Sequence, residues 1–191
     1  MCYKRTHPKR RIYNNLGLYC SSAYLLLTIL LQQGAKANFT TNLENQDIQY
    51  KDIQTRPTPL NSILWTANIE TNDSFLIGYY SYFDTPNTID FAEFPKNHDL
   101  LGTLKNDPLI KRLIKLSNGW YTIEKKNNQL FFNDLRFGQL GIDTSPNRFV
   151  FSYELHYDSN GILKAKERER AIKDASPLLK KLFHRIFGKT S

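Results

Sequence analysis

The stretch LGLYCSSAYLLLTILL, residues 16–31, decides how the rest of the chain is arranged. It is the centre of a longer segment, residues 12–35, that contains no charged side chain. As a helix, this segment spans about 36 Å, enough to cross a hydrocarbon core of about 30 Å. The sequence therefore predicts a transmembrane helix, which we place at residues 12–37.

Charge next to this segment indicates its orientation. Residues 1–11 form a basic flank with five basic side chains and no acidic one. The positive-inside rule keeps such a flank in the cytoplasm. Taken alone, the chain would then carry its remaining residues on the opposite side of the membrane.

Two other interpretations of the apolar segment stay open. A buried helix of a soluble protein is one, although the polar breaks of an amphipathic helix are missing. A secretory signal peptide is the other, since Ala35-Lys36-Ala37 has the small-residue pattern of a cleavage site. Cleavage there would release an exported, non-enzymatic ligand-binding module that begins at Asn38 and binds through the aromatic residues 75–83.

The net charge of +8 belongs to the two ends of the chain. Residues 36–163 carry 12 basic and 15 acidic side chains, whereas residues 164–191 carry nine basic and three acidic ones. A DNA-binding domain needs its basic patch on the folded surface. We therefore expect no nucleic-acid partner, and the basic ends favour a lipid bilayer as the partner.

After a polar connector, residues 38–56, the sequence predicts an α+β domain at residues 57–163. The breaker Arg56-Pro57-Thr58-Pro59 marks its start. Period-two patterns predict six strands close together in the chain, with one helix between them, and so a mostly antiparallel sheet. The expected strands are residues 63–69, 75–83, 88–94, 120–125, 130–136 and 149–157.

Two helices are expected in this part of the chain. Asp107 and Pro108 have the pattern of an N-cap followed by a first helical residue. A second helix follows Ser176 in the basic amphipathic tail, residues 164–191. Its apolar face could lie on an anionic membrane surface or pack against the sheet, because both need the same spacing.

Motifs for catalysis are few. The four histidines have no metal-ligand spacing, and no nucleophile elbow or nucleotide-binding glycine loop is present. Two cysteines are too few for a four-thiolate zinc site. We therefore expect no cofactor and no metal ligand set within this chain.

The pair Asp134 and Arg136 is the most specific local feature. In an extended strand both project to the same side, beside Phe132. The guanidinium could line a site for an anionic group. Alternatively, the two side chains form an ion pair with each other, or Arg136 binds loop carbonyls near Gly138.

Three segments carry a resemblance to a known family. They are PTPLNSILW at residues 57–65, IGYYSYFD at residues 77–84 and FNDLRFG at residues 132–138. In this order and spacing they resemble the carboxy-terminal half of the bacterial inner-membrane metal-dependent hydrolases, also described as LexA-binding inner-membrane hydrolases. The Asn-rich, aromatic version here is similar to members from the Bacteroidetes.

The resemblance implies a carboxy-terminal portion whose catalytic metal site lies elsewhere. Family members begin with several membrane helices that carry His and Asp motifs, and no position here matches them. A divalent metal is then expected only with those helices, which a separate chain could supply. Trp65, Asp134 and Arg136 become candidates for a surface that caps the site. The implied location is the bacterial inner membrane, with the folded domain in the periplasm.

Overall fold

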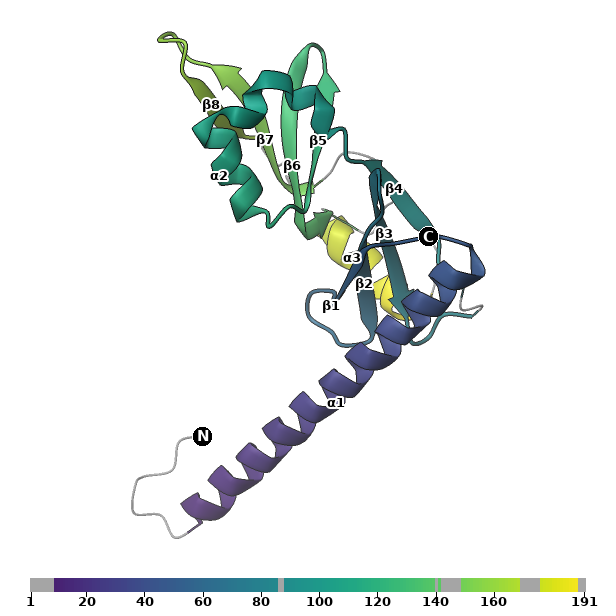
Figure 1. Cartoon of the computed structure of the whole chain (residues 1–191). Coiled ribbons are helices and arrows are strands. Elements are labelled where there is room, and N and C mark those ends of the chain that lie inside the picture. The colour runs from purple at the N-terminus through teal and green to yellow at the C-terminus, as the bar shows by residue number, and fades with distance from the viewer. Residues whose placement is uncertain (1–8, 86–87, 140, 142–148, 169–175, 189–191) are drawn as a thin grey trace.

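The computed structural model describes residues 9–85, 88–139, 141, 149–168 and 176–188. Within these ranges the chain forms a long amino-terminal helix followed by two four-stranded antiparallel sheets and a few shorter helices (Figure 1). The predicted α+β class is confirmed. The strands do not form the single sheet expected from their closeness in the chain, because they divide into two sheets of consecutive strands.

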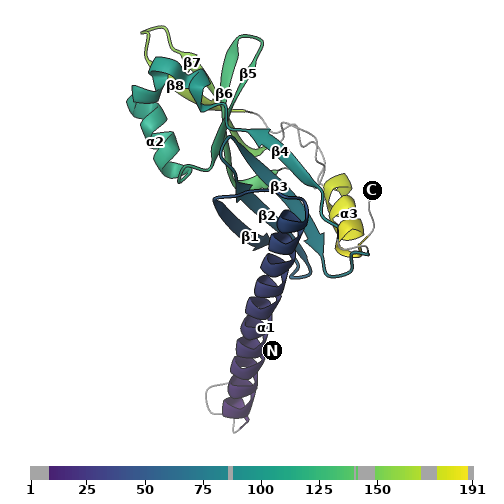
Figure 2. The ribbon, with the colours of Figure 1, turned by 45° about the vertical axis from the view of Figure 1, so that its right-hand side comes forward.

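Helix α1 (Arg10–Asn45) is longer than the predicted span at residues 12–37. At 1.5 Å per residue it extends for about 54 Å. Residues 11–27 are exposed throughout, whereas Ala35, Phe39 and Leu43 are completely buried. The helix therefore has an exposed apolar part and a carboxy-terminal part that belongs to the folded domain (Figure 2).

The first sheet contains β1 (Asp52–Pro57), β2 (Leu64–Glu70), β3 (Ser74–Ser81) and β4 (Phe91–Pro95), paired in that order. Strand β1 lies inside the stretch that we expected to be a connector, so that expectation is wrong for residues 52–56. As an edge strand, β1 has mostly exposed or half-buried residues. Its sequence is therefore polar and lacks the alternating pattern by which we predicted the other strands of this sheet.

The second sheet contains β5 (Tyr121–Lys126), β6 (Gln129–Gln139), β7 (Phe149–Tyr157) and β8 (Leu163–Glu167). Strand β8 pairs with β7 and crosses the expected start of the helical tail at residue 164. Asp158 forms the turn before it, since its Oδ1 accepts bonds from the backbone N–H groups of Asn160 and Ile162, each at 2.9 Å. The tail therefore begins as a strand.

Two helical segments cover one face of the second sheet. They are the 3-10 segment η1 (His98–Asn106) and helix α2 (Pro108–Leu116). Asp107 caps α2 as predicted, with its carboxylate accepting a 2.8 Å bond from the backbone N–H of Leu109. The shared core contains Leu101, Ile110, Leu113, Tyr121, Ile123, Phe132, Leu155 and Leu163.

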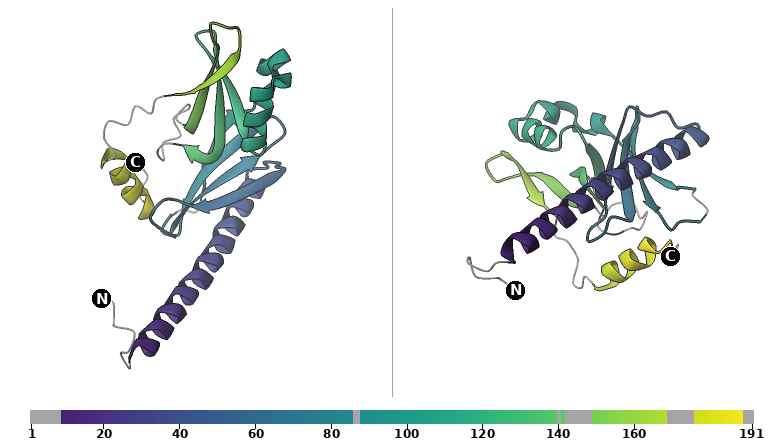
Figure 3. Two further views of the ribbon diagram at one scale, coloured as in Figure 1. Left: turned by 90° about the vertical axis from the view of Figure 1, so that its left-hand side faces the viewer. Right: turned by 90° about the horizontal axis from the view of Figure 1, so that it is seen from below.

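The first sheet is covered on both faces (Figure 3). One face packs against α1 through Trp65, Ala67, Ile69, Leu76 and Tyr80. The other contacts helix α3 (Ser176–Ile186) and the second sheet. This arrangement explains the aromatic residues on both faces of β3, in which every residue except Tyr79 is buried.

Candidate functional site

The exposed part of α1 carries many large apolar side chains and, from residue 12 onward, no charged side chain. Its most apolar 18-residue window has no buried residue, and by length and composition the helix can cross a membrane. Within this chain, the exposure of the window does not fit the alternative of a buried core helix. The exposed side chains are Ile12, Tyr13, Leu16, Leu18, Tyr19, Tyr24, Leu25, Leu26, Leu27, Ile29 and Leu30.

The end of this apolar part is attached to the first sheet by specific contacts. The Tyr82 hydroxyl donates to the Leu31 carbonyl, and Gln32 Nε2 donates to the Thr55 carbonyl at 3.3 Å. A Cβ at Gly34 would lie 2.5 Å from the Tyr82 hydroxyl, so the tyrosine side chain would have to shift to accommodate it. The exposed and buried parts therefore form one continuous helix that is fixed to the domain.

Further along α1, Asn42 links the helix to the segment before β4. Its Oδ1 accepts a 2.9 Å bond from the backbone N–H of Ile89, and Gln46 Nε2 donates to the carbonyl of the same residue at 2.9 Å. Ile89 is 2% exposed and belongs to the core with Phe39. The polar Asn and Gln residues of the expected connector thus hold the helix against the sheet.

Trp65, predicted as part of a binding surface, lies in the core between α1 and the first sheet. It is 2% exposed, and its indole Nε1 donates to the Ser62 carbonyl at 3.0 Å. A buried tryptophan with its N–H satisfied has a structural role. It does not share a surface with Asp134 or Arg136, because it projects from β2 toward α1 whereas β6 contacts the other face.

Asp134 and Arg136 form an ion pair with each other on β6. The Arg136 guanidinium donates from Nη2 to Asp134 Oδ2 at 2.6 Å and from Nε to both carboxylate oxygens at 3.1 Å. The backbone N–H of Arg136 also donates to Oδ1 at 2.9 Å. The carboxylate raises the pKa of Arg136 through these bonds.

A second guanidinium, Arg56 on β1, lies near this pair. Partial burial is the main cause of its lowered pKa, and the positive charge of Arg136 adds to the effect while Asp134 opposes it. Arg56 donates to Gln54 on the same strand. The cluster lies where the first sheet meets β6, close to the 2.7 Å bond from Asn68 Nδ2 to the Leu135 carbonyl. Arg56, Asp134 and Arg136 therefore lie at the junction between the two sheets.

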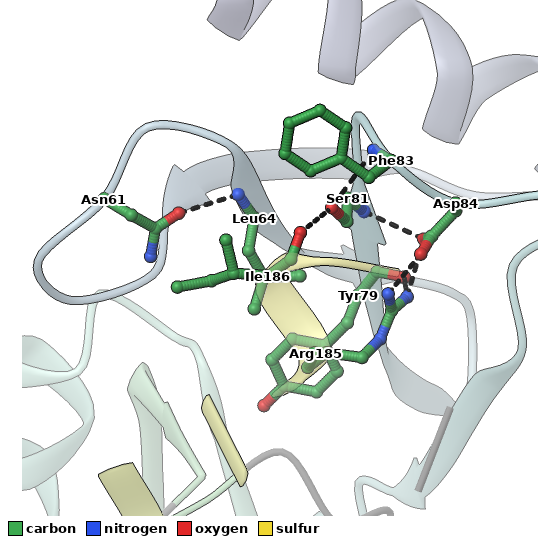
Figure 4. A network of polar contacts seen from close by, with 8 residues as sticks. All are labelled: Asn61, Leu64, Tyr79, Ser81, Phe83, Asp84, Arg185 and Ile186. Carbon is green, nitrogen blue, oxygen red and sulfur yellow. Dashed lines mark hydrogen bonds and ion pairs between the residues drawn. The ribbon is translucent and has the colours of Figure 1, made fainter. Parts of the chain in front are cut away.

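A polar clasp that sequence reasoning missed joins α3 to the end of β3 (Figure 4). Arg185 binds the Asp84 carboxylate through both terminal nitrogens, with Nη2 and Oδ2 at 2.7 Å, and also donates to the Tyr79 carbonyl at 3.1 Å. Asp84 Oδ2 accepts from the backbone N–H of Ser81, whose hydroxyl donates to the Ile186 carbonyl. The partners are a hundred residues apart in the chain, so no local pattern signals the clasp.

The apolar face of α3 packs on the sheet through Leu182, Ile186 and Leu64. Leu182 and Ile186 therefore pack on the sheet, as one of the two alternatives for the amphipathic tail expects. Leu179, Phe183 and the following Phe187 remain exposed.

Metal-ligating side chains are dispersed. Over the residues that the structure describes, no group of three or more His, Cys, Asp or Glu side chains could hold a metal ion. His98 stacks on Tyr121 at 4.0 Å between ring centroids, and its Nε2 lies 2.9 Å from the Tyr121 carbonyl. Burial lowers the pKa of His98, the carbonyl opposes this, and nearby Lys96 and Lys105 lower it further.

Comparisons of the chain with protein-family models, with curated proteins and with solved structures find no match.

Proposed function

We propose that the chain is a membrane-anchored, non-catalytic α+β domain, held beside the bilayer by α1. One observation carries the proposal: the exposed apolar helix continues without a break into the core of the domain. So large an apolar surface is costly in water and is stable inside lipid. The helix thus acts as both anchor and core element.

The same continuity argues against the cleaved signal peptide. Cleavage after Ala37 would remove Ala35 from the core and would break the Tyr82 contact to Leu31 and the Gln32 contact to Thr55. It would also cut the helix three residues after Gly34, where the backbone fits closely against Tyr82. An exported module would therefore lose part of its own packing, which supports retention of the anchor.

We further propose, from the family resemblance, that the domain accompanies membrane helices bearing a metal-dependent hydrolase site. The expected setting is the bacterial inner membrane, with the domain on the periplasmic side and the catalytic residues outside this chain. The internal pairing of Asp134 with Arg136 and the burial of Trp65 support a scaffold role for these residues. The domain would then help to shape the edge of a catalytic site that a partner supplies.

Membrane retention can be tested with a double variant, Leu25→Arg/Leu26→Arg. Arginine at the centre of a membrane helix costs about 2.5–3.5 kcal/mol per residue on insertion scales. The unaltered chain should stay in the membrane fraction after an alkaline wash, whereas the double variant should appear in the soluble fraction. Leu100→Arg, at an exposed position on η1, is the matched control and should remain in the membrane. Equal partitioning of all three chains would contradict the proposal.

Sidedness needs a separate measurement. A cysteine placed at Ser159, in the exposed turn before β8, should react with a membrane-impermeant maleimide in intact cells if the domain is periplasmic. The background chain carries Cys2→Ser and Cys20→Ser. Labelling only after lysis would place the domain in the cytoplasm and contradict the expected topology.

A further inference from the structure

Three exposed apolar side chains lie at the end of the first sheet from which α1 leaves the domain. They come from separate segments: Leu60 in the β1–β2 loop, Phe83 after β3 and Phe187 after α3. They are 84%, 52% and 62% exposed, respectively. Single exposed apolar residues are common, but several at one edge of a sheet favour contact with another apolar phase. We call these three residues the apolar rim.

The apolar rim lies at the level where the exposed part of α1 ends. Tyr82, next to Phe83, contacts Leu31, and Thr55 near the end of β1 contacts Gln32. The views in Figures 1 and 3 agree that this edge of the sheet is the one nearest the projecting helix. If residues 12–30 lie in the hydrocarbon core, the apolar rim is therefore at the membrane interface.

The polar clasp between Arg185 and Asp84 holds the apolar rim in place. The Phe83 ring stacks on Phe187 with centroids 6.1 Å apart and planes 10° apart. Arg185 and Asp84 join the segments that carry these two rings (Figure 4). The exposed rings are thus fixed by buried polar bonds, which means that their exposure does not come from loose packing.

The loop that carries Leu60 is also fixed. Asn61 Oδ1 accepts bonds from the backbone N–H groups of Ile63 at 3.0 Å and Leu64 at 2.7 Å. Leu60 itself has a φ of 66°, in the left-handed region that leucine rarely adopts. The loop therefore presents a large apolar side chain to solvent at a conformational cost.

Charge on α3 fits a bilayer surface. Residues 176–188 contain Lys180, Lys181 and Arg185 and no acidic residue. Lys180 is exposed one turn before the exposed Phe183. Basic residues beside apolar ones are typical of segments that rest on anionic lipid.

We propose that the apolar rim inserts into the interfacial layer of the same bilayer that α1 crosses, so that the domain keeps one fixed orientation on the membrane. The proposal rests on the proposed anchoring function. The apolar rim is a second membrane contact besides α1. It orients the first sheet with its β1–β2 loop toward the lipid.

The test uses tryptophan fluorescence of the full chain in vesicles of brominated phosphatidylcholine and phosphatidylglycerol. The natural Trp65 and Trp120 are buried and supply a constant background. Leu60→Trp should show a blue-shifted difference emission and a loss of intensity in the brominated vesicles. Ile162→Trp, at an exposed position in the β7–β8 turn at the far end of the molecule, is the matched control and should show neither.

The outcomes separate the two proposals. Stronger quenching of Leu60→Trp than of Ile162→Trp supports the inserted rim. Equal quenching in a chain that floats with the vesicles overturns the rim and leaves the anchor standing. A chain that does not float with the vesicles overturns both.

Discussion

At the scale of single residues, the polar clasp between α3 and β3 sets the position of the carboxy-terminal helix. Arg185→Met would leave the Asp84 carboxylate, which is 9% exposed, without its cation. Loss of a charge-assisted bond at such a site should lower the free energy of unfolding by about 2 kcal/mol. Thermal unfolding of the purified chain measures this change.

The ion pair between Lys164 and Asp158 provides the control for that variant. Its atoms are 3.7 Å apart, and the lysine side chain is largely exposed. Lys164→Met should therefore leave the free energy of unfolding almost unchanged. Equal changes in the free energy of unfolding for the two methionine variants would show that the clasp stabilises the chain no more than a surface ion pair does.

His98 gives a second prediction at this scale. Its pKa is lower in the folded chain than the ordinary value of 6.5, mainly because of burial. The unfolded chain therefore binds a proton more readily, so stability is fully present above that value and is lost as pH falls through the folded pKa. As the pH is lowered from about 7 through the folded pKa of His98, the temperature of the unfolding midpoint should decrease. His98→Gln should weaken this pH dependence. An unchanged pH dependence in the variant would contradict the assignment.

At the scale of the element, α1 combines an anchor with a core helix, and its two glycines differ accordingly. Gly34→Leu should displace the Tyr82 side chain, break its hydrogen bond to the Leu31 carbonyl and lower the unfolding midpoint of the domain, with a cost of about 1 kcal/mol for the lost bond. Gly17→Leu should leave the midpoint unchanged, because nothing lies within 4 Å of its Cβ position. A lower midpoint for both variants would show that α1 does not behave as two parts.

At the scale of the whole molecule, sequence patterns predicted what local chemistry controls. The uncharged segment predicted the helix, the Asp107 cap predicted α2, and alternating patterns located strands in both sheets. Division into two sheets could not be predicted in this way, because it depends on long-range contacts such as that of Asn68 with Leu135. Edge strands β1 and β8 were missed because their residues are mostly polar.

The candidate site was harder to predict than the fold. The same-side placement of Asp134 and Arg136 was readable from strand period, but whether they bind each other or a ligand depends on the surroundings of β6. The period-two pattern of residues 63–69 placed Trp65 on the apolar side of its strand, but its cover comes from α1, which lies far away in the chain. The apolar rim joins three segments that meet only in the folded molecule.

The central claim is that α1 is one uncleaved helix that links the bilayer to the core of the domain. Mass spectrometry of the mature protein extracted from membranes tests it most directly. We predict a membrane-bound chain that retains residues 12–37. A soluble mature chain that begins at Asn38 would contradict the account.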